Sequence, residues 1–264
     1  MKRLVVTMVP VVVAVFAGAA QATPYIADSS EEAHVPVVIQ DFFLVGNGRD
    51  GARRAMQADL SFARDMARHH QGAVDMARAY LDDPRGTNPV IQHLARAIIH
   101  NQAFEIAVLD VVRRHVEAGP MTIARLGSYQ VVSLSRGVDG LEHEWFFVEA
   151  PPPSVLDLWF SSDPRISAFD VQFARPMIEH HSAALKMATA YNTNPDGGNS
   201  VLGPLNINIL ISQRYEIGLL RRLIARYPGD PTTVPDDPKM MEIMHRSMSG
   251  MHGSNDGGGT PPHH

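Results

Sequence analysis

Residues 59–80 have the sequence DLSFARDMARHHQGAVDMARAY, and residues 170–191 have the sequence DVQFARPMIEHHSAALKMATAY. Twelve of these 22 positions are identical at a constant offset of 111 residues. The same offset continues downstream, where Gln102 and Glu105 match Gln213 and Glu216. The chain therefore contains one two-segment unit twice, and this duplication is the main constraint on its fold.

Both segments of each unit have the periodicity of amphipathic helices. The apolar residues and histidines of 59–80 follow the 3-4-3 spacing of one helical face, and residues 91–109 form a similar stripe. Between them, Asn88 is the predicted N-cap and Pro89 the predicted first helical residue. Two helical hairpins can bury their stripes only by packing together, so we expect an all-α fold with a four-helix bundle.

The rest of the chain divides where its composition changes. A basic start, an apolar run and the small-x-small sequence ending at Ala22 predict a cleaved signal peptide, with a retained membrane anchor as the alternative. Short β-rich runs between the hairpins predict an irregular or small β insertion. The predicted parts are a signal peptide (1–22), an extended arm (23–48), hairpin 1 (49–118), the insertion (119–165), hairpin 2 (166–228) and a mobile Met/His-rich tail (229–264).

The composition excludes several classes of site. The chain has no cysteine, so disulfides, thiolate zinc sites and cysteine nucleophiles are impossible. Its net charge of -5 argues against a nucleic-acid partner, and no second apolar run is long enough to cross a membrane. Thirteen Met and 13 His remain as soft or borderline metal ligands. We expect an exported protein that is periplasmic or secreted.

The inward stripe of the repeats carries the candidate metal ligands. An imidazole is costly to bury unless its nitrogens are bonded or bind a metal, and thioether with imidazole suits Cu(I). The alternative is that the methionines fill the core and the histidines are hydrogen-bonded core residues. The candidate ligands are Met66, His69, His70 and Met76 in repeat 1, and Met177, His180, His181 and Met187 in repeat 2.

Polar residues near this stripe are candidates for a second shell around a metal. They can orient the imidazoles, accept hydrogen bonds from them without a metal, or bind the metal directly. Asp59 and Asp170 have the further alternative of capping or preceding their helices. The second-shell candidates are Asp59, Gln102, Glu105, Asp170, Gln213 and Glu216.

The C-terminal segment is a second cluster of methionine and histidine. Residues 239–252 have the sequence KMMEIMHRSMSGMH, and the surrounding Pro, Gly, Ser and Asp predict mobility. A mobile metal-collecting tail is the preferred interpretation, and a short amphipathic helix docked on the bundle is the alternative. The candidate ligands on one face are Met241, Met244, His245, Met248, Met251 and His252.

The D-x-x-F-x-x-x-M-x-x-H-H-x-x-A-x-x-M-A motif followed by Q-x-x-E-I resembles a family of small secreted bacterial proteins. That family is catalogued as a domain of unknown function, is recognised by its His-His motif and is placed in the ferritin-like superfamily. The resemblance implies a ferritin-like bundle of two hairpins and, from some members, periplasmic copper binding. Repeat 2 departs from the motif because Ser182 and Ala183 replace Gln-Gly. Pro176 is expected to kink or delay its helix, which predicts a weaker second half-site.

These observations predict an exported copper-binding protein for metal tolerance, storage or delivery, with Cu(I) favoured. Its partners would be metal ions and other periplasmic metal-handling proteins. One alternative is a ferritin-like metal-dependent oxidase, although a di-iron site needs about four inward carboxylates and two E-x-x-H pairs. No E-x-x-H sequence occurs in the repeats, and one runs from Glu31 to His34, in the N-terminal arm. A metal-free structural or interaction bundle is the other alternative.

Overall fold

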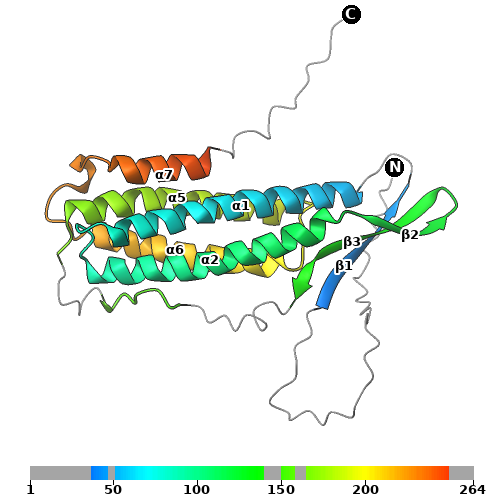
Figure 1. Cartoon of the computed structure of the whole chain (residues 1–264), viewed down its shortest axis with the longest axis horizontal. Coiled ribbons are helices and arrows are strands. Elements are labelled where there is room, and N and C mark those ends of the chain that lie inside the picture. Colours follow the sequence, from blue (N-terminus) through cyan, green and yellow to red (C-terminus); the bar gives the residue numbers. More distant parts are fainter. Residues whose placement is uncertain (1–36, 47–50, 140–149, 158–164, 250–264) are drawn as a thin grey trace, which may run out of the picture.

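The computed structural model describes residues 37–46, 51–139, 150–157 and 165–249, and the chain there is mostly helical with one small sheet. Long helices lie side by side, with the sheet at one end and a short helix on the outside (Figure 1). The predicted signal peptide lies outside the described residues. The elements are β1 (Val37–Val45), α1 (Gly51–Asp82), α2 (Pro89–Glu117), β2 (Met121–Leu126), β3 (Tyr129–Asp139), α5 (Ala168–Thr193), α6 (Leu202–Ile224), a 3-10 turn (Pro231–Thr233) and α7 (Pro238–Met248).

Local sequence signals set several helix ends. The Asn88 side chain accepts hydrogen bonds from the backbone N–H groups of Val90 and Ile91, at 3.0 and 3.2 Å, and Pro89 begins α2 as expected. Ser167 and Asp170 form a capping box at the start of α5. This helix runs unbroken from Ala168 through Pro176, so the expected delay is wrong, because the capping box starts the helix two turns before the proline.

The strands form a three-stranded antiparallel sheet in the order β1-β3-β2. The predicted insertion supplies β2 and β3, and the predicted N-terminal arm supplies β1, which pairs with β3 along its whole length from Val37 to Val45. The end of the arm is therefore part of a sheet, since the backbone groups of β3 need a partner on each side. This sheet lies at the end of the bundle where α1 begins (Figure 1).

The two repeats pack through reciprocal contacts between α1 and α5. The Tyr80 hydroxyl donates to Asp170 at 2.5 Å, and the Tyr191 hydroxyl donates to Asp59 at 2.6 Å. In each helix the aspartate lies in the N-terminal half and the tyrosine near the C-terminal end, so α1 and α5 are antiparallel. The repeats are consequently related by a local two-fold axis, as the offset of 111 residues makes the two Tyr–Asp pairs equivalent.

The core has two apolar clusters, one on each side of the two-fold axis. The first cluster contains Met76 and Met177 with residues of α2, α6 and α7. The second contains Met66 with residues near the sheet, and Met187 packs against it. A buried layer of polar side chains, the polar layer, belongs to neither cluster. Its residues are His69, His70, Gln102, Glu105, His180, His181, Gln213 and Glu216. The bundle interior is therefore apolar towards both ends and polar in the middle.

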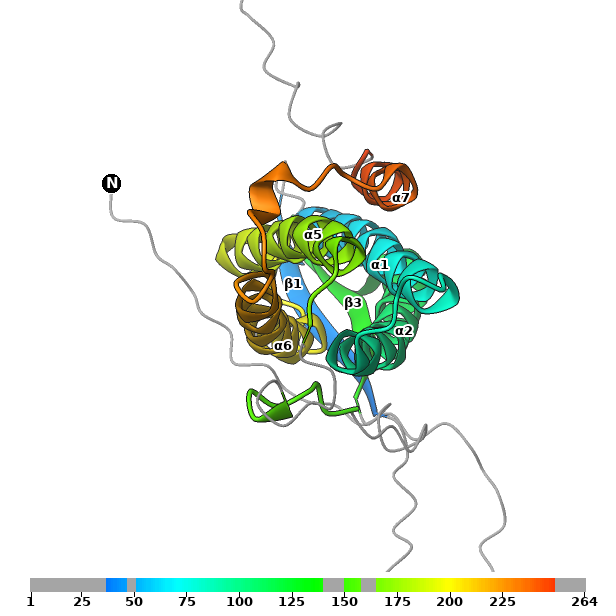
Figure 2. The same cartoon turned by 90° about the vertical axis from the view of Figure 1, so that its left-hand side faces the viewer.

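Residues 238–248 form helix α7, so the expectation of a mobile tail is wrong for this part of the chain. Met240, Ile243 and Met244 are buried in the first apolar cluster, and Asp237 caps the helix through the N–H groups of Lys239 and Met240. Burying three apolar side chains offsets the entropy of ordering the segment. Figure 2 shows α7 on the side of α1 and α5 that faces away from α2 and α6.

Candidate metal centre

His69 and His180 meet at the centre of the bundle. They occupy equivalent positions in the two repeats, both are fully buried, and their ring centroids are 3.7 Å apart with 31° between the planes. A contact between two equivalent residues lies on the two-fold axis that relates them. The polar layer is therefore built around this pair.

The neighbouring histidines each pair with a glutamate from the second helix of their own hairpin. His70 Nε2 lies 2.8 Å from Glu105 Oε2, and His181 Nε2 lies 2.6 Å from Glu216 Oε2. Both half-sites therefore bring a histidine Nε2 close to a glutamate oxygen, despite Pro176, and of the two pairs only His181–Glu216 also has hydrogen-bond geometry. The weaker second half-site stays a prediction.

Helix α7 adds a group that the sequence did not single out. Ser247 Oγ lies 3.1 Å from His180 Nε2 and donates to the Met244 carbonyl oxygen at 2.8 Å. Because the hydroxyl proton is used on that carbonyl, His180 Nε2–H donates to Ser247, and the Nδ1 of His180 carries a lone pair. Ser247 gave no signal beyond being a small residue in a Met-rich segment.

Several imidazole nitrogens have no hydrogen-bond partner among the described residues. They are both ring nitrogens of His69 and of His70, and Nδ1 of His180 and His181, and His70 Nε2 is in ion-pair contact with Glu105. Burial, with a smaller contribution from the neighbouring histidines, lowers the pKa of His69 and His180 well below its ordinary value. Both rings are therefore neutral at pH 7, and a neutral imidazole nitrogen is the form that binds a metal.

The methionines do not converge on one point. Met66 and Met187 belong to the apolar region near the sheet, whereas Met76 and Met177 belong to the other cluster. At a rise of about 1.5 Å per residue, Met66 and Met177 stand about 4.5 Å to opposite sides of the histidine pair. A single site with all four methionines is therefore not formed. Each side of the histidine pair has its own nearest thioether, Met66 on one side and Met177 on the other.

The second-shell candidates also separate into two groups. Glu105 and Glu216 contact the histidines, and Gln102 and Gln213 are buried with their Oε1 atoms unpartnered in the described structure. Asp59 and Asp170 lie ten residues before the paired histidines, about 15 Å along each helix. The two aspartates form the Tyr–Asp pairs instead, so they do not orient the imidazoles.

Asp59 has a second partner from the sheet. Arg136 on β3 is buried, and its guanidinium lies 3.2 Å from Asp59 and 3.2 Å from Asp41. The Asn199 side chain donates to Asp59 at 2.9 Å. Burial raises the pKa of Asp59, and the Arg136 charge opposes that shift. Arg136 lies outside the repeats, so no sequence pattern pointed to it, whereas the repeated Tyr80 and Tyr191 could have been noticed.

The C-terminal ligand candidates are divided by helix α7. Met244 is buried in the core, Met241 and Met248 are half-buried, and His245 is exposed. Met251 and His252 lie outside the described residues. Among the described residues, no three His, Asp or Glu side chains converge in an arrangement that could hold a metal ion. Any metal site in the bundle therefore needs a sulfur ligand or a small shift of the histidines.

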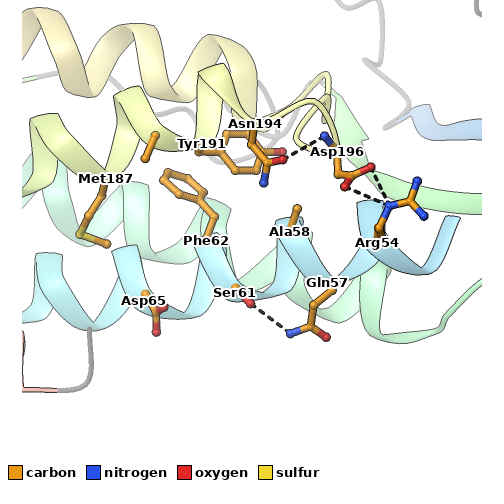
Figure 3. Close-up of a pocket in the computed structure, with 11 residues that line it drawn as sticks. Arg54, Gln57, Ala58, Ser61, Phe62, Asp65, Met187, Tyr191, Asn194 and Asp196 are labelled. Atoms are coloured by element: carbon orange, nitrogen blue, oxygen red, sulfur yellow. Dashed lines mark hydrogen bonds and ion pairs between the residues drawn. The ribbon is translucent and has the colours of Figure 1, made fainter. Parts of the chain in front are cut away.

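A surface groove lies away from the histidines, between the start of α1 and the end of α5. Its volume is about 450 Å³, and Figure 3 shows Phe62, Met187 and Tyr191 on its floor with Arg54 and Asp196 at one end. Arg54 Nε lies 3.1 Å from Asp196 Oδ2. None of the four histidines lines this groove, so it is a separate surface feature.

Comparisons with known proteins identify a family but no activity. The model of a family described as "Domain of unknown function (DUF305)" matches residues 51–116 and 167–257, which is more than half of the chain. The comparisons with curated proteins and with solved structures give no match. Of the helices in the described residues, none is both long and apolar enough to span a membrane.

Proposed function

We propose that this chain, which belongs to the DUF305 family of unknown function, is an exported copper-binding protein with a ferritin-like four-helix bundle. The observation that carries the proposal is the buried pair of His69 and His180, with neutral rings and unpartnered nitrogens at the repeat axis. An unpartnered buried polar atom costs about 1–3 kcal/mol, so such a cluster favours a ligand. Copper, when bound, would supply a Lewis acid for these lone pairs.

Cu(I) fits the donor set better than the harder cations. The available donors are imidazole nitrogens in the middle and thioether sulfurs on either side, and the chain has no thiolate. We propose that His69, His70, His180 and His181 hold the metal, with Met66 and Met177 as the nearest thioethers on each side. A periplasmic or secreted location and a role in tolerance, storage or delivery belong to the same proposal.

Competitive titration with Cu(I) under anaerobic reducing conditions tests the proposal. The chain should compete with a chromophoric Cu(I) chelator, and the His69→Ala/His180→Ala variant should lose at least a hundredfold in affinity. The His115→Ala variant is the matched control, because His115 lies near the end of α2 and its Nδ1 is hydrogen-bonded to the Val111 carbonyl oxygen. Equal affinity of the two variants would overturn the bundle site.

A metal-free structural bundle is the competing function, because two of the four histidines already have carboxylate partners. In that case added copper would leave the melting temperature unchanged. A copper-binding chain should instead melt at a higher temperature as free copper rises. The oxidase alternative has less support, since within the described part of the chain only Glu105 and Glu216 bring carboxylates to the polar layer.

A further inference from the structure

The polar layer has two sides that face outward, and helix α7 closes one of them. A Cβ placed on Gly72 would lie 2.3 Å from the Cβ and Oγ of Ser247 and 2.9 Å from His180 Nε2. The Gly72 backbone and the Ser247 side chain are thus in direct contact, and no space is left between α1, α7 and the His180 imidazole. Arg85 also pairs with Asp237 at 3.1 Å, which holds the start of α7 against the bundle.

The opposite side of the layer, between α2 and α6, contains a cavity of about 50 Å³. Glu105 and Glu216 line it, and these are the carboxylates that contact His70 and His181. The cavity therefore borders the outer edge of the histidine layer. Its polar lining residues are Asn101, Gln102, Glu105, Asn208, Ser212 and Glu216.

One atom in this lining needs a ligand. The Gln102 side chain lines the cavity and is 3 % exposed, and its Oε1 has no hydrogen-bond partner among the described residues. A volume of this size holds a few water molecules or a partly hydrated ion. Two carboxylates in a low-dielectric cavity attract cations, and because oxygen is a weak ligand for a soft metal, Cu(I) would not be held there.

A backbone segment on the same side ties α2 to α6. The Asn101 side chain makes two hydrogen bonds with the backbone of Ala150, at 2.9 and 2.8 Å, and the Tyr215 hydroxyl donates to the Pro153 carbonyl oxygen at 2.8 Å. Asn101 belongs to α2 and Tyr215 to α6, so the segment bridges the two helices beside the cavity. This bridge adds contacts between the two helices at the side of the cavity.

We propose that the cavity between α2 and α6 is the entry site for cations, which pass Gln102 and the carboxylates of Glu105 and Glu216 to reach the histidine layer. Helix α7 seals the other side and is not the route. The inference rests on the proposed function, because it assigns a path to the same metal. Its ligand class is a soft monovalent transition-metal cation, which is Cu(I) in the proposed function.

Uptake kinetics test this path separately from affinity. Cu(I) is supplied as its acetonitrile complex, and the Cu(I) left outside the protein is read at set times with a chromophoric chelator. The Asn208→Trp and Ser212→Leu variants narrow the cavity and should slow uptake at least tenfold, with equilibrium affinity unchanged within about twofold. Ile211→Trp is the control on the same helix, since Ile211 is 65 % exposed and does not line the cavity.

Loosening α7 provides the opposing arm of the experiment. Arg85→Ala removes the ion pair with Asp237 at the start of α7, and uptake should stay within about twofold of the wild type. A tenfold faster uptake in Arg85→Ala, with normal uptake in Asn208→Trp, would overturn the assignment and place the route under α7. Normal uptake in all variants would also overturn it.

A metal-free measurement separates this inference from the proposed function. Exchange of the imidazole Cε1 hydrogen for deuterium, followed by mass spectrometry, reports water access to each histidine in the apoprotein. Asn208→Trp should slow this exchange at His70 and His181 at least threefold, and Ile211→Trp should not. If the wild type bound no copper, the proposed function would fail, yet this exchange would still show whether the cavity is the path of access.

Discussion

The two ends of the α1–α5 surface are equivalent by sequence, but only one of them is covered. At the covered end, Met76 and Ala79 are buried under α7. At the other end their equivalents, Met187 and Ala190, are half-buried and exposed, and both line the open groove of Figure 3. The same helical pair therefore presents a filled groove and an empty one, as far as the described residues reach.

The sequence differences between the repeats follow this asymmetry. Gly72 contacts Ser247 of α7, whereas Ala183 takes the equivalent place in repeat 2, where α7 does not dock. The interior histidines and the Tyr–Asp pairs, by contrast, are the same in both copies. The comparison teaches that the two repeats share these polar interior contacts, whereas the surface beside them differs.

The largest test compares the two buried aspartates. Asp59→Ala leaves buried Arg136 without its main interior partner and should cost about 4 kcal/mol of unfolding free energy. Asp170→Ala removes a capping box and the Tyr80 hydrogen bond and should cost about 2 kcal/mol. Urea denaturation measures both, and Arg136→Met in the Asp59→Ala background should recover part of the loss. Equal costs would break the asymmetry at this position.

The histidine pair on the axis is tested by pH in the metal-free protein. Burial lowers the pKa of His69 and His180 in the folded state, so below about pH 6.5 the unfolded chain binds protons that the folded chain does not. The unfolding free energy should therefore fall as pH decreases from about 6.5 to the folded-state pKa, by up to about 1.4 kcal/mol per pH unit for each ring.

Two variants identify the source of that slope. His69→Gln/His180→Gln should remove most of it, and the control His115→Gln should retain it. Denaturation midpoints between pH 5 and 7 provide the measurement. A slope that survives in the double variant would show that the buried pair is not the group that titrates.

The equivalent methionines report the cover that α7 provides. Met76→Ala creates a cavity in a fully buried site and should cost about 3 kcal/mol. Met187→Ala at the half-buried equivalent should cost about 1 kcal/mol, because water fills the space that the side chain leaves. Chemical denaturation of the two variants side by side gives the difference, and equal losses would contradict the role of α7.

The smallest change exchanges the two residues at the α7 contact. Gly72→Ala places a Cβ against Ser247 and should cost about 2 kcal/mol, whereas Ala183→Gly should cost only the helix propensity of about 1 kcal/mol. Ser247→Gly should destabilise the wild type but partly rescue Gly72→Ala. Thermal melting of the four variants measures this coupling, and simple additivity would show that the contact is not tight.

The sequence predicted those parts of the structure that repeat or obey local rules. The duplicated pattern indicated the helices and the inward histidines, and Asn88 followed standard capping chemistry. The docking of α7 was the alternative prediction and not the preferred one, because Pro, Gly and Ser around it suggested mobility and burial of Met240 and Met244 depends on a tertiary partner. Pro176 was misjudged because tertiary packing and an early cap sustain a helix against one lost hydrogen bond.

The candidate site was predicted in its residues but not in its arrangement. The offset of 111 residues identified both histidine pairs, yet only the structure shows that His69 and His180 stack while the methionines separate. Arg136 could not have been assigned to Asp59, because the pairing joins a sheet strand to a helix with no repeated pattern. The periodicity of the sequence predicts which face of a helix is buried, but it does not predict which distant segment that face contacts.

The crossed Tyr–Asp pairs have a consequence for how the repeats depend on each other. A single hairpin of this type carries an aspartate and a tyrosine that do not meet, since each pairs with the other copy. Two separate hairpins would satisfy all four groups only as a symmetric dimer, whose stability falls on dilution. Joining them in one chain makes the second copy an internal partner at fixed effective concentration, so the fold is independent of protein concentration.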